Sequence, residues 1–191
     1  MGTRDDLDVR PVTADRWDDL VALFGERGAF GGCWCMYWRV TSADFAAEAG
    51  AGLRQRLRRL VVDGREPGLL AYEDGEPVGW VAVAPRPEFG RMQRSPTVNP
   101  VDDTPTWMVN CFYIDRRHRR AGVARQLLDA AVAFARARGA EAVEGVPVDT
   151  RGTRRESAGL YTGTLAMFEE AGFVEIARRR QRPIVRQAAP R

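Results

Sequence analysis

Apolar side chains recur along the chain with two different spacings, and these spacings divide it into strands and helices. Runs with the alternation or apolar density of strands are predicted at 9–13, 68–85, 107–114, 142–148, 173–177 and 181–185. Apolar residues at helical spacing predict helices at 13–28, 41–62, 123–138 and 158–171. Strands that alternate with helices, with no internal repeat and no second domain, indicate a single α/β domain.

Some boundaries follow from residues that turn or break the chain. Asp74-Gly75 predicts a tight turn that makes the first long strand run a β-hairpin. Gly50 and Gly52 are points at which the second helix could break, and Gly163 is a weak point in the last helix.

Two connections are predicted to be irregular. Residues 85–105 are rich in proline and polar side chains, and this segment is long for a loop inside a compact domain. Because long loops are often functional, we expect it to be partly disordered or to form a lid over a substrate site. Residues 151–156 are predicted as a polar loop.

Composition narrows the class of protein. The 191 residues are 45% hydrophobic and 9% aromatic, which is typical of one globular domain. The sequence has no apolar run long enough to span a membrane, and residues 1–17 lack the apolar segment of a signal peptide. We therefore expect a cytoplasmic protein. All 29 basic residues are arginine.

The net charge of +3 is unevenly distributed. Residues 178–191 contain six arginines and no acid, which leaves 23 basic against 26 acidic residues in the remainder. The body of the protein therefore lacks the basic surface of a nucleic-acid-binding protein. We interpret residues 178–191 as a solvated strand edge with a frayed basic tail rather than as a binding arm.

The sulfur and imidazole side chains give no metal pattern. The chain has three cysteines, Cys33, Cys35 and Cys111, and one histidine, His118. The odd number of cysteines argues against a disulfide framework, and a spacing of two differs from the C-x-x-C of zinc and redox sites. We predict no metal.

The stretch 110–139 combines a strand, a basic turn and an amphipathic helix. The helix face carries Val123, Leu127, Ala131 and Phe134, and Gly139 stands where the helix should end. A helix start leaves main-chain N–H groups without partners and carries partial positive charge. Gly122 has no Cβ, so an anion could approach the backbone, and the surrounding arginines raise the local potential. The turn therefore predicts a pyrophosphate site.

This stretch resembles the signature of the GNAT acyl-CoA-dependent N-acetyltransferases. The signature is a strand followed by Arg/Gln-x-x-Gly-x-Gly/Ala and a helix, and Arg119, Gly122 and Ala124 occupy its three defining places. The hairpin before it also resembles the second and third strands of that family. The alternative is an ordinary strand-to-helix corner with solvated arginines.

The resemblance implies a fold and a cosubstrate. The fold is one GNAT-like α/β domain over residues 1–191, a mixed central sheet of about six to seven strands flanked by about four helices. Two central parallel strands splay apart, and the pantetheine of acetyl-CoA inserts between them. A main-chain N–H of the central strand polarises the thioester. The implied cofactor-binding residues are Phe112, Tyr113, Ile114, Arg119, Arg120, Ala121, Gly122, Val123, Ala124 and Arg125.

The segment 31–39 is a candidate for the acceptor site because it is dense in large rings. By the resemblance, Trp34, Tyr37 and Trp38 would form an apolar wall, with Arg39 holding an anionic group. The alternative is core packing, and both interpretations could hold for alternate residues. The segment is also similar to one in actinobacterial GNAT-like proteins, which conveys no substrate.

The catalytic residues are the point at which the chain departs from the family. The tyrosine that often protonates the leaving thiolate is replaced by Phe168, and Tyr161 is a substitute if it is not a core residue. Asn110 and Cys111 occupy the strand positions where a base is expected, and neither is a good base. We interpret Cys111 as a buried thiol. The remaining candidate bases are Glu26, Glu144 and Asp149.

The function implied by the resemblance is transfer of an acetyl group from acetyl-CoA to the amine of a small molecule by direct attack. One alternative is an N-acyltransferase that acts on a protein or peptide, which would need an open groove. The other is a non-catalytic acyl-CoA sensor, consistent with the missing tyrosine and base. No nucleic-acid or membrane partner is expected, and a homodimer stays open.

Overall fold

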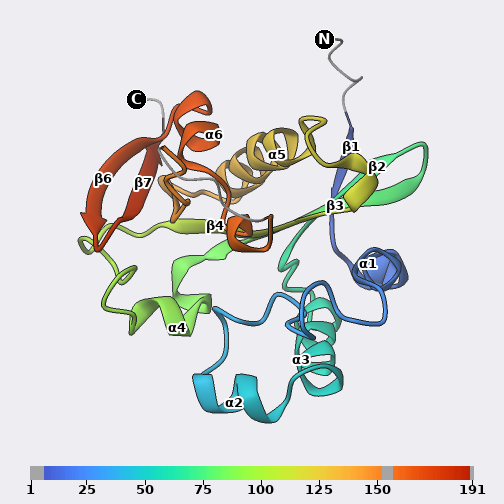
Figure 1. The fold of residues 1–191 in the computed structure, drawn as a ribbon. Coiled ribbons are helices and arrows are strands. Elements are labelled where there is room, and N and C mark those ends of the chain that lie inside the picture. Colours follow the sequence, from blue (N-terminus) through green and yellow to red (C-terminus); the bar gives the residue numbers. More distant parts are fainter. Residues whose placement is uncertain (1–6, 152–156, 190–191) are drawn as a thin grey trace.

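The computed structural model describes residues 7–151 and 157–189. Within these residues, seven strands form one sheet in the order β1-β2-β3-β4-β5-β7-β6 (Figure 1). The strands are β1 (Asp8–Pro11), β2 (Gly68–Glu73), β3 (Glu76–Pro85), β4 (Trp107–Ile114), β5 (Ala142–Gly145), β6 (Val174–Arg179) and β7 (Arg182–Ala188). All neighbouring strands are antiparallel except β4 and β5, which are parallel. The predicted mixed sheet of six to seven strands is confirmed.

The described residues contain more helices than the four expected. The α-helices are α1 (Trp17–Phe24), α2 (Ser42–Ala47), α3 (Ala51–Val62), α4 (Gly90–Gln93), α5 (Val123–Ala137) and α6 (Leu165–Glu170). The expected helix over 41–62 is divided at Gly50, one of the two predicted break points. Helix α4 lies in the segment that was expected to be irregular.

The helices cover both faces of the sheet. Helices α5 and α6 lie on one face, and α1 to α4 lie on the other (Figure 1). The buried side chains of Val123, Leu127 and Ala131 on α5 pack against the sheet, as the helical spacing predicted. The opposite face holds a separate core built from α1, α3 and the aromatic segment between α1 and α2.

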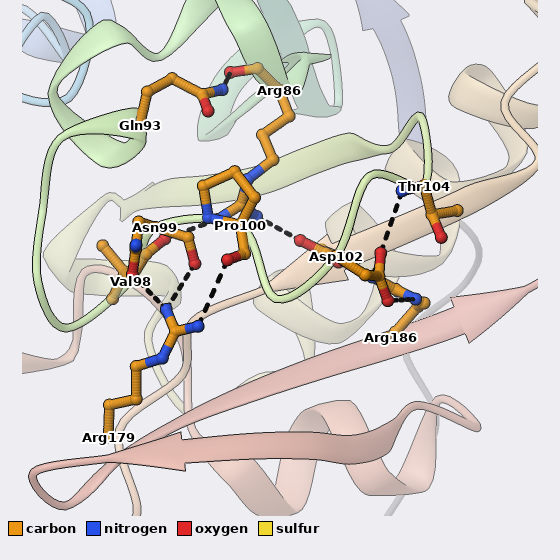
Figure 2. Close-up of polar contacts among 10 residues, drawn as sticks. Arg86, Gln93, Val98, Asn99, Pro100, Asp102, Thr104, Arg179 and Arg186 are labelled. Atoms are coloured by element: carbon orange, nitrogen blue, oxygen red, sulfur yellow. Dashed lines mark hydrogen bonds and ion pairs between the residues drawn. The ribbon is translucent and has the colours of Figure 1, made fainter.

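Residues 86–105 form an ordered part of the fold, so the expectation of a disordered loop or lid was wrong. Arg86 is buried, and its guanidinium pairs with the buried carboxylate of Glu144 on β5 and donates to the carbonyl of Val98. Arg179 on β6 donates to the carbonyls of Asn99, at 2.7 Å, and Pro100 (Figure 2). Side chains from two distant strands therefore hold the segment in place.

The chain after residue 157 also differs from two expectations. The predicted helix over 158–171 is interrupted, because Gly163 adopts φ of 80° between a short 3₁₀ turn at Ser157–Leu160 and α6. Most of the supposed basic tail is structured, since β6 and β7 include residues 178–179 and 182–188. Most of the predicted polar loop at 151–156 lies outside the described residues.

No helix in the described ranges 7–151 and 157–189 has the length and apolar character needed to cross a membrane.

The carboxylate of Glu144 generates a stability prediction. Its side chain is 2% exposed and accepts bonds from Arg86 and, at 2.7 Å, from Arg186. We expect Glu144→Gln to lower the free energy of unfolding by about 3–5 kcal/mol, because the Arg86 charge would stay buried without its partner. Urea unfolding measures the loss.

Asp102 provides the matched control. Its carboxylate also pairs with Arg186, at 2.9 Å, but its side chain is 45% exposed. We expect Asp102→Asn to cost no more than about 1 kcal/mol, because an exposed ion pair is screened by solvent. Equal losses in the two variants would contradict the structural role given to Glu144.

Candidate active site

Strand β4 contains one extra residue opposite β3. The register shifts between residues 110 and 113, so that Val81 lies opposite both Cys111 and Phe112. Cys111 has a φ of 53°, in the left-handed region that residues with side chains rarely adopt. Strict alternation would place Cys111 on the face of Val109. Because of the bulge, Phe112 shares the core of Val109 under α5, and Cys111 faces the core on the opposite side.

Strands β4 and β5 separate next to this bulge. Their parallel pairing ends at Val109 opposite Gly145, whereas β4 continues to Ile114. Beyond the separation, the main-chain N–H of Phe112 donates to the carbonyl of Tyr161 at 2.7 Å. The segment that carries Tyr161 therefore borders the gap between the two splayed strands.

A cavity of about 980 Å³, here called the central cavity, is lined by three groups of residues. The turn before α5 contributes Arg119 and Arg120, the first turn of α5 contributes Ala124, and the bulged half of β4 contributes residues 111–114. The third group surrounds an apolar space and consists of Ala29, Phe30, Gly31, Cys33, Cys35, Tyr37, Phe45, Leu160, Tyr161, Gly163, Thr164 and Met167. One cavity thus joins the predicted anion site, the central strand and the aromatic segment.

The turn before α5 has the backbone geometry of an anion site. Gly122 adopts φ of 84°, and a Cβ built there would meet no atom within 4 Å. The first main-chain bonds of the helix run from the N–H groups of Arg125 and Gln126 to the carbonyl of Gly122. The N–H groups of residues 123 and 124 therefore have no intrahelical acceptor and are available to a ligand.

The arginine side chains around this turn differ in whether they are held by protein partners. Arg119 donates to the carbonyl of Ile114 at 3.2 Å, and Arg125 pairs with Asp129 at 2.9 Å. Arg120 lines the cavity and makes no side-chain hydrogen bond or ion pair with any residue in the described ranges. Val123 is buried in the core under α5, so only its main chain could contact an anion. Ala121 packs against the same core.

The aromatic segment between α1 and α2 alternates between cavity and core. Tyr37 lines the cavity, together with Cys33 and Cys35. Trp34 is 4% exposed and stacks on Trp17 with ring centres 6.2 Å apart, so its assignment to the acceptor wall was wrong. Trp38 packs between two cores and does not line the cavity either.

Arg39 is not available to an anionic acceptor group. Its side chain is 4% exposed, and it pairs with Glu88 at 2.8 Å. It also donates to the carbonyl of Pro67 at 3.2 Å and lies 4.4 Å from the ring centre of Phe89. The guanidinium therefore stabilises the fold, and its assignment as an acceptor residue was wrong.

The catalytic candidates also separate. Asn110 is fully buried and does not line the central cavity, so it cannot act there as a base. Its side-chain amide has no hydrogen-bond partner among the described residues. Phe168 is fully buried against Phe112 and Phe173. Tyr161 does line the cavity, and burial raises the pKa of its phenol well above the ordinary value, so it stays protonated at neutral pH.

The three carboxylates considered as bases lie elsewhere. Glu144 belongs to the buried pair with Arg86, and Asp149 pairs with Arg178 at 2.9 Å. Glu26 is exposed and is absent from the cavity lining. Among the described residues, none of these three reaches the central cavity.

Comparison with known proteins decides the family. Residues 33–165, more than half of the chain, match the sequence profile of the acetyltransferase (GNAT) family. The chain belongs to the GNAT acetyltransferase family. The matched range includes the hairpin, the bulged strand and the turn at Gly122. A search of curated proteins found no match.

Solved structures support the same fold. An acetyltransferase of the GNAT family from Streptococcus agalactiae has a TM-score of 0.57 and 11% identity, over 98% of each chain. The PaiA N-acetyltransferase from Thermoplasma acidophilum, solved with coenzyme A, has a TM-score of 0.55 and 11% identity, over 96% of this chain and 99% of that one. Diaminobutyrate acetyltransferase EctA from Paenibacillus lautus, solved with L-2,4-diaminobutyric acid and coenzyme A, has a TM-score of 0.51 and 15% identity, over 98% and 96%.

Sequence reasoning missed several residues of this GNAT cavity. Phe30 and Phe45 lie on either side of the aromatic segment, and Met167 is in α6. Phe45 is 5.3 Å from Tyr37 between ring centres, nearly perpendicular to it. Phe45 lies in the helix predicted over 41–62, and helical spacing alone does not distinguish a cavity wall from a core.

The alternation of the aromatic segment generates a prediction for two adjacent residues. We expect Tyr37→Leu to raise the KM for the acceptor, because it removes a cavity ring. We expect Trp38→Leu to lower the free energy of unfolding by up to about 3 kcal/mol, because it removes a packed ring. The KM for the acceptor should stay unchanged in this variant. Steady-state kinetics and urea unfolding of both variants test this. A raised KM for Trp38→Leu alone would reverse the assignment.

Proposed function

We propose that this GNAT protein is a cytoplasmic enzyme that transfers an acetyl group from acetyl-CoA to the amine of a small molecule by direct attack. The observation that carries the proposal is the single cavity that joins the turn at Gly122, the bulge of β4 and an apolar wall. An acyl donor with a pyrophosphate and a long thiol-bearing arm fits this sequence of surfaces.

Each part of the cavity then has a role. The N–H groups at the start of α5 and the Arg120 guanidinium bind the pyrophosphate. Main-chain N–H groups of the bulged strand, at residues 112–114, polarise the thioester carbonyl, which favours negative charge on its oxygen as the amine attacks. The Phe112 N–H is bonded to the Tyr161 carbonyl, so its use requires an exchange of that bond. The amine binds beside Tyr37 and Phe45.

The described cavity lining favours an uncharged acceptor. Its ionisable members are arginines, tyrosines and cysteines, and it includes no carboxylate or histidine. An ammonium ion would lose hydration there without a carboxylate partner.

The absence of a carboxylate or histidine from the described cavity lining also supports a second candidate function, an acyl-CoA sensor without catalysis. Incubation with acetyl-CoA and a panel of amines separates the two. Amine-dependent thiol release supports the enzyme, and binding of CoA without release supports the sensor.

The turn at Gly122 generates a binding prediction. We expect Gly122→Val to weaken CoA binding at least about tenfold, a loss of about 1.4 kcal/mol, because its side chain enters the open space where the pyrophosphate binds. Isothermal titration calorimetry measures the affinity.

Gly139 at the other end of α5 is the matched control. It has nearly the same φ, 83°, and a Cβ there would also meet no atom within 4 Å. Gly139→Val therefore brings the same type of backbone strain without entering the site. Equal CoA affinity in the two variants would contradict the assignment of the pyrophosphate site.

Tyr161 generates a kinetic prediction. Its protonated hydroxyl can donate to the leaving thiolate of CoA, and a positioned acid contributes about 10²–10⁴-fold. We expect Tyr161→Phe to lower kcat at least about tenfold with CoA affinity unchanged, because the ring and the main-chain carbonyl that binds Phe112 stay in place. A kcat within about twofold of the unsubstituted enzyme would show that water, or unassisted thiolate departure, completes the reaction.

A further inference from the structure

All three cysteines of the chain meet at the central cavity. Cys33 and Cys35 come from the loop after α1, and Cys111 comes from the bulge of β4. Cys35 interacts with both other thiols, so the three form a connected group that we call the thiol trio. All three thiols are free in the structure. Neither the proposed acyl transfer nor the packing of the two cores requires three sulfur atoms at this place.

The backbone that presents these thiols is strained. Cys35 and Cys111 have φ values of 52° and 53°, and Trp34 between the first two cysteines has φ of 42°. All three lie in the left-handed region, which costs free energy for residues with side chains. The strained turn points Trp34 into the core and leaves Cys33 and Cys35 on the cavity wall. Such strain often accompanies a functional arrangement.

The three thiols are in different protonation environments. A hydrogen bond from the Cys35 thiol lowers the pKa of Cys33 to about 6. Burial raises the pKa of Cys35 above the ordinary value of a thiol, and its two sulfur neighbours add to the shift. Cys33 is also the most exposed of the three. The Cys33 thiol also donates to the carbonyl of Gly28 at 3.9 Å, a contact that is lost when the thiol ionises. The lowered pKa nevertheless favours the thiolate of Cys33 over that of Cys35 at the cavity wall.

The trio does not have the arrangement of a metal site. Within the described residues, no group of three or more histidine, cysteine, aspartate or glutamate side chains is placed to hold a metal ion. A partly exposed thiol with a lowered pKa, on the wall of a cavity that we propose to bind a thiol-bearing ligand, instead favours thiol–disulfide exchange.

We propose that Cys33 is a modification site that captures the CoA portion of a CoA-containing disulfide as a mixed disulfide. This inference rests on the proposed CoA site. The captured CoA would occupy the central cavity, so the modified protein could not bind acetyl-CoA. A thiol reductant would release it and restore binding.

The exchange is balanced without a further oxidant. The Cys33 thiolate attacks the CoA-side sulfur of a disulfide between CoA and a small thiol. The disulfide bond between CoA and the small thiol breaks, and a disulfide bond between Cys33 and CoA forms. The small thiol leaves as a thiolate and takes a proton from solvent.

Binding of the CoA portion makes the reaction selective. The nucleotide end held at the Gly122 turn raises the local concentration of the disulfide at the trio. A disulfide that lacks the nucleotide is not concentrated at the trio and reacts only through bimolecular encounters with Cys33. The selectivity for CoA is therefore the signature of the proposal, beyond general reactivity of Cys33.

The test compares two disulfides that release the same thiol. The full-length protein is treated with the mixed disulfide of CoA and glutathione, or with glutathione disulfide, and analysed by non-reducing intact-mass spectrometry and peptide mapping. We expect one CoA per chain on Cys33, formed at least about tenfold faster than the glutathione adduct. Dithiothreitol should remove it. Gly122→Val should abolish the advantage of the CoA disulfide, whereas Gly139→Val should keep it.

Two further variants complete the test. Cys33→Ala should form no CoA adduct, and Cys35→Ala should slow its formation, because it removes the donor to the Cys33 thiolate. Circular dichroism confirms that each variant is folded. Equal rates with the two disulfides, or a CoA adduct that persists in folded Cys33→Ala, would overturn the proposal. CoA binding and amine-dependent turnover without any adduct would overturn it and leave the proposed function intact, whereas absence of CoA binding by calorimetry would contradict the function itself.

Discussion

The extra residue in β4 is the constraint on which the candidate site depends. If β4 alternated regularly, Cys111 would lie on the same face as Val109, and Phe112 would lie on the opposite face. The main chain of β4 could then pair with both neighbouring strands along its whole length. The bulge places Cys111 on one face and Phe112 on the other, immediately beyond the last β4–β5 pair at Val109. The strands separate there, and the N–H of Phe112 points to the Tyr161 segment instead of to β5. The positive φ of Cys111 is the local cost of this arrangement.

The rest of the fold holds the two sides of this gap apart. On one side, the β2–β3 hairpin and the amphipathic face of α5 fix β4 and the turn at Gly122. On the other side, β5 is held by β7 and by the buried pair of Glu144 with Arg86. Arg179 and Arg186 then connect residues 99–102 to the C-terminal strands (Figure 2). Arg179 and Arg186 thus stabilise the sheet, and neither belongs to a free basic tail.

The parts of the site with local signals could be predicted from the sequence. The helix start at Gly122, the hairpin turn and the helix end at Gly139 each depend on residues within a few positions. The bulge has no such signal, because Cys111 and Phe112 are ordinary strand residues and their register depends on β3. Tyr37 lines the cavity whereas Arg39 is buried in an ion pair, and this difference depends on distant contacts. The partner of Arg39, Glu88, is 49 residues away in the sequence. Gly163 indicated that the last predicted helix could break. That the broken segment lies beside the gap between β4 and β5 depends on tertiary packing, which the local sequence does not show.

A crystal structure of the protein with CoA is the most direct test of the central claim, that the bulged and splayed strand leads from an anion site to the place of acyl transfer. The account predicts the pyrophosphate at the N–H groups that begin α5 and the thiol-bearing arm along β4. It also predicts that the Phe112 N–H no longer bonds to the Tyr161 carbonyl. The account would be contradicted by CoA bound with its pyrophosphate in the separate pocket of Val148, Arg178 and Arg182, and with the Gly122 turn and the Phe112–Tyr161 bond unchanged.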